Sequence, residues 1–388
     1  MSKGIRIKGY RRPDGSCGIR NHIAVISTVA CANHIAELTA AACPDAVPIT
    51  HQHGCDQIGL DLDLFYKTLL GVAQNGNVAA VMTVGLGCEE ISAHDLAEAV
   101  AKTGKSAVSL VIQEEGGTSE SVKVGRERLQ KLSSSFKPSE EEIGFEELII
   151  GLECGGSDFS SGIIANPALG EAVDLFIREG AAVIFCETTE LLGAEEIIIQ
   201  RSASAEVAQF ILQKMNRIEE AAAVMGTDIR GAQPSPGNIR GGLSTIEEKS
   251  LGAICKIGSA KIEHVLNFAD HCTERGLNFM DTPGNDIESM AGLAAGGAQI
   301  IIFTTGRGTP MGFATVPVLK VCASPKASRV MQENIDVDLS SFFKGDLSIT
   351  DAGRKIFHTA VRCASGEPCR AEILGHREFG LHRIGPTL

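Results

Sequence analysis

Three side chains that bind transition metals lie close together in the segment HQHGCDQ, which spans residues 51–57 and follows the apolar stretch AVPIT. His51 and His53 offer imidazole nitrogens and Cys55 offers a thiolate, and transition metals prefer ligands of these kinds. A single histidine would carry little weight, whereas this spacing makes a metal site one candidate interpretation. An ordinary polar loop is the alternative interpretation, and the segment by itself leaves both open.

Two further cysteines lie in glycine-rich segments after short apolar runs. Cys88 belongs to VGLGCEE and Cys154 to GLECGGSD, and the preceding runs are typical of strands buried on both faces. In an open α/β sheet the loops after the carboxyl ends of the strands converge on one crevice, so we expect Cys55, Cys88 and Cys154 to face one site. The other cysteines lack this combination of glycine and acidic neighbours and are interpreted as structural: Cys17, Cys31, Cys43, Cys186, Cys255, Cys272, Cys322, Cys363 and Cys369.

Carboxylates accompany two of these thiols. Glu89 and Glu153 are immediate neighbours of the two cysteines, and Asp158 ends the GLECGGSD segment. A carboxylate beside a metal or a substrate can accept a proton or supply an oxygen ligand. We therefore predict Glu89, Glu153 and Asp158 as candidate catalytic bases.

Two loops are predicted to bind the substrate. Arg307 follows a very apolar strand in IIIFTTGRGTPMG, and the planar fork of its guanidinium suits a carboxylate. The segment PSPGNIRGGLSTIEEKSLG contributes Asn238, Arg240 and Lys249, and it leads into a helix whose free N–H groups can bind an anion. Solvent-exposed turns are the alternative interpretation for both loops.

The composition excludes several classes of protein. The chain has 388 residues, of which 44% are apolar and 21% charged, and its net charge of −13 argues against binding to nucleic-acid phosphates. It contains no run of about 18 uncharged apolar residues, and its basic N-terminal segment lacks the apolar core of a secretion signal. Because twelve dispersed cysteines fit reduced thiols, we expect a cytoplasmic enzyme that binds neither nucleic acid nor a membrane.

Short apolar runs alternate with helical patterns, which predicts an α/β fold with largely parallel sheets, βαβ units and a Rossmann-like arrangement in two subdomains. Helices are predicted for residues 92–104, with Ser92 as the N-cap, and for residues 166–180, with Pro167 in the first turn. A polar stretch near residues 133–147 is the predicted boundary between two domains. We therefore expect an N-terminal α/β domain, residues 1–136, with the His and Cys loops, and a C-terminal α/β domain, residues 146–388, with the substrate-binding loops.

Together these motifs resemble those of the altronate and galactarate dehydratases, which are sugar-acid hydro-lyases. The resemblance covers nearly the whole chain and is carried by GYRRPDGSCGIRN, HQHGCDQIG, VGLGCEE, GLECGGSDFSSGIIANPALG, ETTELLGAEE, PSPGNIRGGLSTIEEKSLG, MDTPGNDIESMAGLAAGGAQIIIFTTGRGTP and GHREFGLHRIGPTL. It implies a metal-dependent, usually iron-dependent, removal of water from a polyhydroxy acid to give a 2-keto-3-deoxy acid. It does not fix which sugar acid is the substrate.

The resemblance implies Fe²⁺ as the cofactor, with Mn²⁺ as a further candidate, and two arrangements of ligands remain open. In the first, His51, His53 and Cys55 hold a single iron. In the second, Cys55, Cys88 and Cys154 hold an iron–sulfur cluster whose remaining iron binds the substrate hydroxyl. The spacing of these cysteines matches no local cluster signature, which favours the single iron.

The sequence departs from the single-chain dehydratases at its start, because GYRRPDG occurs almost at the first residue. The resemblance then implies a separately encoded small subunit in place of their N-terminal SAF-like domain, within an assembly expected to be oligomeric. The large subunit of a sulfolactate sulfo-lyase shares the resemblance, but it is expected to differ at the positions of Cys55 and Cys88. A catalytically idle binding subunit is a third hypothesis, disfavoured by the density of His, Cys, acidic and Arg motifs.

Overall fold

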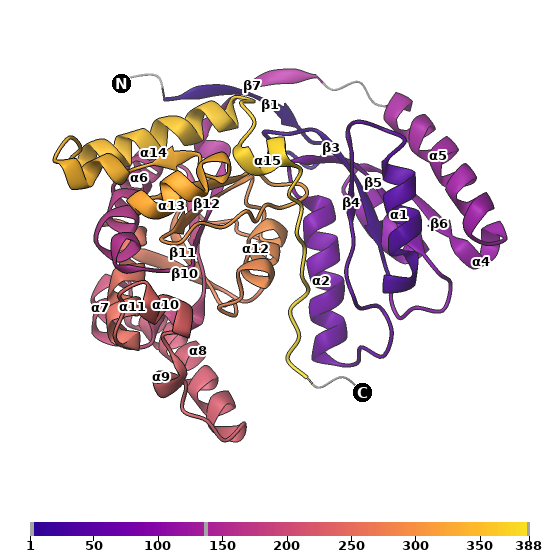
Figure 1. Cartoon of the computed structure of the whole chain (residues 1–388). Coiled ribbons are helices and arrows are strands. Elements are labelled where there is room, and N and C mark those ends of the chain that lie inside the picture. Colours follow the sequence, from indigo (N-terminus) through magenta and orange to yellow (C-terminus); the bar gives the residue numbers. More distant parts are fainter. Residues whose placement is uncertain (1–3, 136–138, 386–388) are drawn as a thin grey trace.

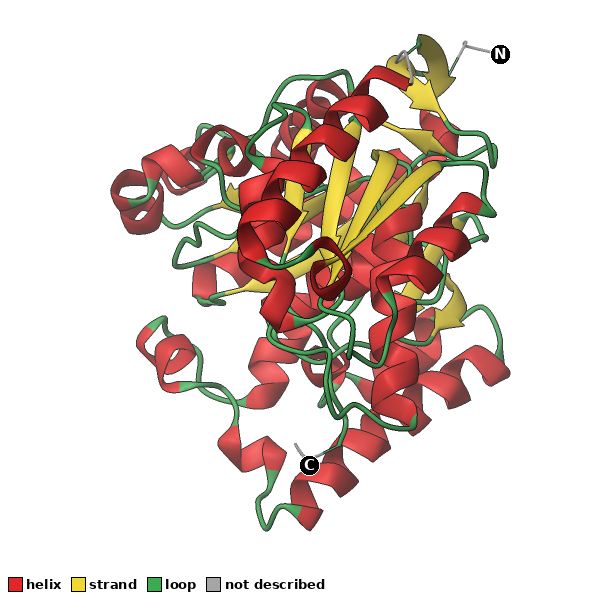
Figure 2. Ribbon diagram, turned by 90° about the vertical axis from the view of Figure 1, so that its right-hand side faces the viewer, coloured by secondary structure: helices red, strands yellow, loops and turns green. Residues whose placement is uncertain are grey.

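The computed structural model describes residues 4–135 and 139–385, which form two parallel sheets joined by a small antiparallel sheet (Figure 1). The smaller parallel sheet has the strand order β4-β3-β5-β6, and the larger has the order β10-β11-β9-β8-β12-β13-β14. Figure 2 shows that helices lie on both sides of the strands. The predicted α/β fold with parallel sheets is therefore confirmed.

The smaller parallel sheet forms the first unit of the chain. Helices α1 and α5 pack on one face of this sheet, and α2 and α3 pack on the other. The elements in chain order are β3 (His22–Ser27), α1 (Asn33–Ala40), β4 (Ala46–Ile49), α2 (Leu60–Gln74), β5 (Val78–Gly85), α3 (Ala93–Ala101), β6 (Ser106–Val111), α4 (Ile112–Glu115) and α5 (Thr118–Ser135).

The larger sheet forms the second unit. Its strands are β8 (Ile149–Gly155), β9 (Ala182–Phe185), β10 (Ile262–Leu266), β11 (Gly276–Met280), β12 (Ile300–Thr305), β13 (Val318–Cys322) and β14 (Val337–Asp338). The helices of this unit are α6 (Asn166–Arg178), α7 (Glu195–Arg201), α8 (Ala205–Val224), α9 (Ile229–Ala232), α10 (Pro236–Arg240), α11 (Ile246–Ile254), α12 (Asp286–Ala295), α13 (Pro325–Val330), α14 (Ile349–Ala364) and α15 (Arg370–Leu374). No helix in the described parts of the chain has both the length and the apolar character needed to cross a membrane.

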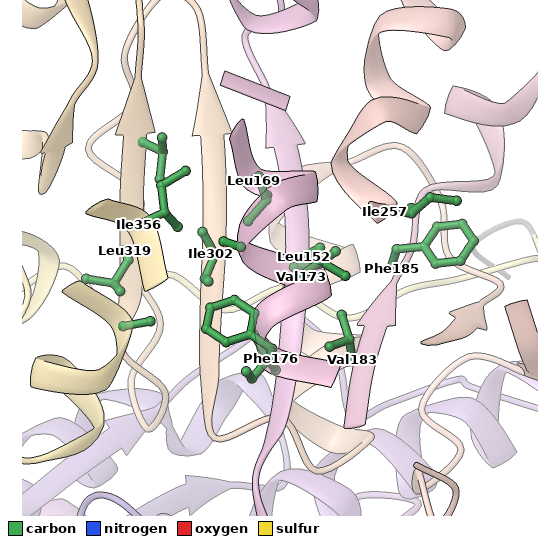
Figure 3. Packing of buried hydrophobic residues seen from close by; sticks show 14 of the residues in the cluster. Leu152, Leu169, Val173, Phe176, Val183, Phe185, Ile257, Ile302, Leu319 and Ile356 are labelled. Atoms are coloured by element: carbon green, nitrogen blue, oxygen red, sulfur yellow. The ribbon is translucent and has the colours of Figure 1, made fainter. Parts of the chain in front are cut away.

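The core of the second unit forms where α6 and α14 cover one face of the large sheet. Figure 3 shows side chains of α6 close to side chains of the neighbouring strands, among them Phe176, Val173, Leu152, Val183 and Ile302. Residues of β8 are buried along the whole strand, because helices cover both faces of the sheet. Burial on both faces explains why these strands appear in the sequence as continuous apolar runs.

Both helices predicted with defined ends are present. Ser92 precedes α3, and its hydroxyl accepts hydrogen bonds from the backbone N–H groups of His94 and Asp95. Pro167 lies in the first turn of α6, which continues directly from a π-helical turn formed by residues 161–165. These capping and first-turn signals depend on neighbouring residues alone, which is why the sequence sufficed to locate them.

The polar stretch predicted as the boundary between the two domains contains regular structure that the sequence did not indicate. Helix α5 ends at Ser135, residues 136–138 lie outside the described residues, and residues 140–144 form strand β7 (Glu140–Gly144). This strand pairs antiparallel with β1 (Arg6–Arg11), which also pairs with β2 (Cys17–Gly18). In Figure 1 this small sheet lies at the top, next to both units.

The C-terminal segment, residues 376–385, returns to the first unit. Figure 1 shows this yellow segment running down between the units beside α2. Near its end, the backbone N–H groups of Ile384 and Gly385 donate hydrogen bonds to the Asp61 carboxylate at 2.7 and 3.1 Å. The segment therefore brings side chains from the end of the chain close to the HQHG loop.

Candidate functional site

His51 is buried in the HQHG loop, and both of its ring nitrogens are engaged. Its Nδ1 accepts a hydrogen bond from the His53 backbone N–H at 3.2 Å, so Nε2 carries the proton and donates to the Ser27 carbonyl at 2.7 Å. The ring also packs edge-on against Phe65 at 5.1 Å, and burial lowers its pKa to about 4. The expectation that His51 binds a metal is therefore not supported, because the neutral ring anchors the loop.

His53 is half-buried and faces charged groups from three elements. Burial lowers the pKa of His53, the positive charge of Arg383 lowers it further, and the carboxylates of Asp61 and Glu288 oppose the shift. Glu288, in the first turn of α12, also lies 2.8 Å from the Nδ1 atom of His382. The HQHG loop, α2, α12 and the C-terminal segment thus meet at one place.

Glu89 holds the loop that carries Cys88. One carboxylate oxygen accepts backbone N–H hydrogen bonds from Leu86, Gly87 and Cys88 at 3.1, 2.6 and 3.1 Å. The other accepts a hydrogen bond from the Thr28 hydroxyl at 2.9 Å. Because both oxygens are occupied, Glu89 positions the loop rather than serving as the free base that the sequence suggested.

The structure separates one of the three predicted thiols from the other two. Cys55 and Cys88 are exposed at the carboxyl edge of the small sheet, whereas Cys154 is buried in β8 of the large sheet and accepts a hydrogen bond from Asn166 at 3.5 Å. Cys31 takes the place of Cys154 beside the other two: it is exposed, and the negative charges of Cys31 and Cys88 add to the effect of desolvation in raising the pKa of Cys55. The structural interpretation of Cys31 does not fit this position.

Glu153 belongs to a second cluster of ionisable groups, which is buried at the carboxyl ends of β8 and β9. The Lys256 ammonium lies 2.7 Å from Glu190 and 3.2 Å from Glu187, and these two carboxylates raise its pKa well above the usual range despite burial. The Cys186 thiol donates to Glu153 at 3.1 Å, and donor atoms of Glu153, Cys186 and Glu187 lie within 4.8 Å of one another. Such a spacing suits a shared proton or a cation.

The protonation of Glu153 predicts a pH-dependent stability. Burial, assisted by the charge of Asp286, raises its pKa from 4.5 to about 8. The folded state then binds more protons than the unfolded state between these values, so stability is fully present below pH 4.5 and is lost as the pH rises to 8. Glu153→Gln is expected to remove this slope, and the variant should gain a few kcal/mol relative to wild type across the window.

Urea unfolding at several pH values measures this effect, and Glu196→Gln is the matched control because Glu196 is exposed on α7. The control should follow the wild-type curve at every pH. A Glu153→Gln curve that runs parallel to wild type would show that Glu153 is ionised in the folded protein.

The predicted substrate loops meet where the strand order reverses between β8 and β12. The backbone N–H of Arg307 donates to Gly156 at 3.1 Å, and its guanidinium donates to the Gly237 carbonyl at 2.9 Å. The amide of Asn238 is buried and donates to the Ser157 carbonyl at 3.0 Å. These contacts hold the loops together, and they leave the exposed part of Arg307 available to a ligand.

The other predicted residues of these loops differ in their surroundings. Asp158 is buried and accepts hydrogen bonds from the Ser160 hydroxyl and the Ser161 backbone N–H, which makes it a helix cap rather than a free base. Arg240 is exposed at the end of α10. Lys249 is close to Asp286. Burial raises the pKa of the Asp286 carboxyl, and the positive charge of Lys249 opposes this shift. Lys249 therefore lies near the first turn of α12.

A cleft of about 480 Å³ lies between the two units. It is bounded by α2, α8, the segment that leads into α12 and the C-terminal segment. Its polar side chains include Arg217 and Lys214, which contact Asp281 at 2.8 and 3.4 Å, together with His382 and Arg383. Positive charge and a histidine in a partly apolar cleft suit a small organic anion.

Several of these residues were not identified from the sequence. Cys31 follows the apolar run AVISTVA much as Cys88 follows its own run, and this signal was available. His382 and Arg383 lie in GHREFGLHRIGPTL, where no local pattern indicates their neighbours in space. Lys256 and Glu190 pair across 66 residues of sequence, which only the fold brings together.

Two family models match the chain and together span almost all of it. Residues 9–137 match the model described as D-galactarate dehydratase/altronate hydrolase, second domain. Residues 145–387 match the model described as D-galactarate/altronate dehydratase, C-terminal.

Individual relatives match over most of their own length. The β subunit of (2R)-sulfolactate sulfo-lyase from Chromohalobacter salexigens is 36% identical over 98% of this chain and 98% of its own. Altronate dehydratase from Bacillus subtilis is 34% identical over 98% of this chain and 78% of its own. Galactarate dehydratase from Escherichia coli is 32% identical over 94% of this chain and 74% of its own.

Proposed function

Because the chain belongs to the D-galactarate and altronate dehydratase family, and is therefore a lyase, we propose that it removes water from a sugar acid with the help of iron. One observation carries the proposal: the exposed thiols Cys55 and Cys88 lie on the same edge as His53, whose charged neighbours include Arg383 and Glu288. Arg383 also lines the cleft between the two units, which connects the HQHG loop with that cleft.

The proposed reaction requires both a base and an electrophile. The carbon next to the carboxylate loses a proton, the neighbouring carbon loses hydroxide, and the two leave as water. The resulting enol tautomerises to the 2-keto-3-deoxy acid. A proton beside a carboxylate is weakly acidic and hydroxide is a poor leaving group, so neither bond breaks readily without assistance.

His382 is the proposed base. The Glu288 carboxylate lies 2.8 Å from Nδ1, which fixes the ring and leaves Nε2 to accept the substrate proton. Arg217 and Lys214 line the same cleft and supply positive charge for the substrate carboxylate. Their contacts with Asp281 hold both side chains in place before the substrate binds.

Iron, when bound, supplies a Lewis acid that polarises the leaving hydroxyl. Cys55 and Cys88 are its proposed ligands, with His53 beside them. The part of the chain that the structure describes provides no hydrogen-bond partner for either thiol, so both sulfurs are available to a metal. Thiolate and imidazole donors suit iron better than Mn²⁺, which prefers oxygen ligands.

A small partner subunit is part of the proposal. The similarity to a sulfo-lyase β subunit over 98% of both chains supports it, since the name of that protein implies a further subunit. We propose that a separately encoded SAF-type subunit covers the cleft in a cytoplasmic, oligomeric assembly. A covered cleft excludes water and strengthens the electrostatic stabilisation of an enediolate.

A sulfo-lyase activity is the second candidate. The observation that favours it is the 36% identity to the sulfo-lyase subunit, compared with 34% to altronate dehydratase. In that reaction sulfite rather than hydroxide leaves. The same base and the same cationic groups would serve both reactions, so the leaving group must be tested directly.

We expect the protein, purified without oxygen and combined with a small subunit, to form a 2-keto acid from at least one aldonate or aldarate. Chelation of iron should abolish this activity because the leaving hydroxyl is then no longer polarised. A colorimetric assay for 2-keto acids over a panel of sugar acids measures the reaction, with sulfite release from sulfolactate assayed in parallel. Sulfite release without dehydration of any sugar acid would assign the second candidate, and inactivity towards both substrate classes would contradict the proposal.

A further inference from the structure

Three cysteines come from three adjacent strands of the small sheet. Cys31 follows β3, Cys55 follows β4 and Cys88 follows β5, and these strands are neighbours in the order β4-β3-β5. Because the strands are parallel, the three loops leave the sheet at the same edge. All three thiols are exposed.

Backbone contacts tie these loops to one another. The N–H of Ala30 donates to the His53 carbonyl at 2.8 Å, which joins the first loop to the second. The N–H of Glu90 donates to the Gly54 carbonyl at 3.2 Å, which joins the second loop to the third. Gly54 has a φ of 121°, and a Cβ atom there would lie 2.5 Å from the Cα of Val29. The backbones of the three loops are therefore held together without help from a ligand.

A single ion and a cluster require different separations between the sulfurs that bind them. Around one tetrahedral metal with metal–sulfur bonds of about 2.3 Å, the sulfurs lie about 3.8 Å apart. Within residues 4–135 and 139–385, three side chains have metal-binding atoms that all lie within 4.8 Å of one another, and they are Glu153, Cys186 and Glu187. Cys31, Cys55 and Cys88 do not meet this criterion as a set. Several irons bridged by sulfide occupy more space than one ion and suit thiolates that are further apart.

We propose that Cys31, Cys55 and Cys88 hold a [4Fe–4S] cluster whose fourth iron has no protein thiolate and is open to the substrate, an inference that rests on the proposed function. Clusters of this kind are normally held by four cysteine thiolates, so a set of three leaves one iron with a free position. Arg383, whose charge acts on His53 in the second loop, also lines the cleft proposed for the anionic substrate. Cys31 thus replaces Cys154 in the cluster that the sequence suggested.

The test measures iron and acid-labile sulfide in protein purified without oxygen. We expect about four of each per chain, together with a visible absorption band that is lost on exposure to air. Cys31→Ser, Cys55→Ser and Cys88→Ser should each lose most of the iron and sulfide while retaining the circular dichroism of the folded protein. Cys255→Ser is the matched control, because Cys255 is also exposed but lies in the second unit, where its thiol donates to the Leu251 carbonyl.

Alkylation followed by mass spectrometry gives a second measurement that does not depend on activity. In the loaded protein the three ligand cysteines should resist iodoacetamide while Cys255 reacts, and removal of iron should make those three react as well. One iron per chain without sulfide, or an intact cluster in Cys31→Ser, would overturn the cluster even if sugar acids are dehydrated. A loaded cluster in a protein without lyase activity would instead overturn the proposed function.

Discussion

Replacing Lys256 by methionine is expected to lower the free energy of unfolding by about 3–5 kcal/mol near pH 8, because breaking a buried ion pair leaves an unpaired charge in the core. The ammonium lies 2.7 Å from Glu190 and 3.2 Å from Glu187, and all three side chains are only 2% exposed. Methionine keeps much of the aliphatic chain but carries no cation. Urea unfolding followed by circular dichroism measures the difference.

Lys102→Met is the matched control for this prediction. Lys102 pairs with Glu98 at 3.1 Å on the surface of α3, where the two side chains are 73% and 69% exposed. An exposed pair contributes about 0–1 kcal/mol, so its loss should be small. Adding Glu190→Gln to Lys256→Met should restore part of the stability, since the amide needs no cation. A loss below about 1 kcal/mol in Lys256→Met would contradict a buried ion pair at this position.

Features that depend on neighbouring residues could be predicted from the sequence. Ser92 caps α3 and Pro167 begins α6 as expected, because a cap or a fixed φ angle acts within one helical turn. The apolar runs likewise identified the buried strands. Strand β7 could not be predicted in this way, because its sequence EEEIG is polar and its partner β1 lies more than a hundred residues away.

Only some of the residues that lie together in the candidate site could be predicted from the sequence. Cys88 and Cys154 both follow apolar strands, and nothing local shows that β5 and β8 belong to different sheets. In the same way, His51 and His53 are equivalent in the sequence, but the chain turns one ring into the core and leaves the other half-exposed. Strand order and side-chain direction therefore decided which predicted ligands share a site.

The role of His382 leads to the second prediction with a large effect, which again rests on the proposed function. His382→Ala is expected to lower kcat for the preferred substrate by about a hundredfold or more, because a positioned general base commonly supplies that factor. The value of KM should change less, since Arg217 and Lys214 remain to bind the substrate carboxylate. Steady-state kinetics of the iron-loaded complex provides both parameters, and added imidazole should restore part of the lost rate.

His376→Ala is the matched control for His382→Ala, because His376 lies in the same C-terminal segment and forms the same kind of pair, with Glu378 at 3.0 Å. His376 does not line the cleft between the units, so its replacement should leave kcat within a few-fold of wild type. Equal losses in the two variants would indicate that the segment is needed for folding rather than for proton transfer. A large loss in His53→Ala combined with an active His382→Ala would instead assign the base to the HQHG loop, and the proposed role of the His382–Glu288 pair would then be wrong.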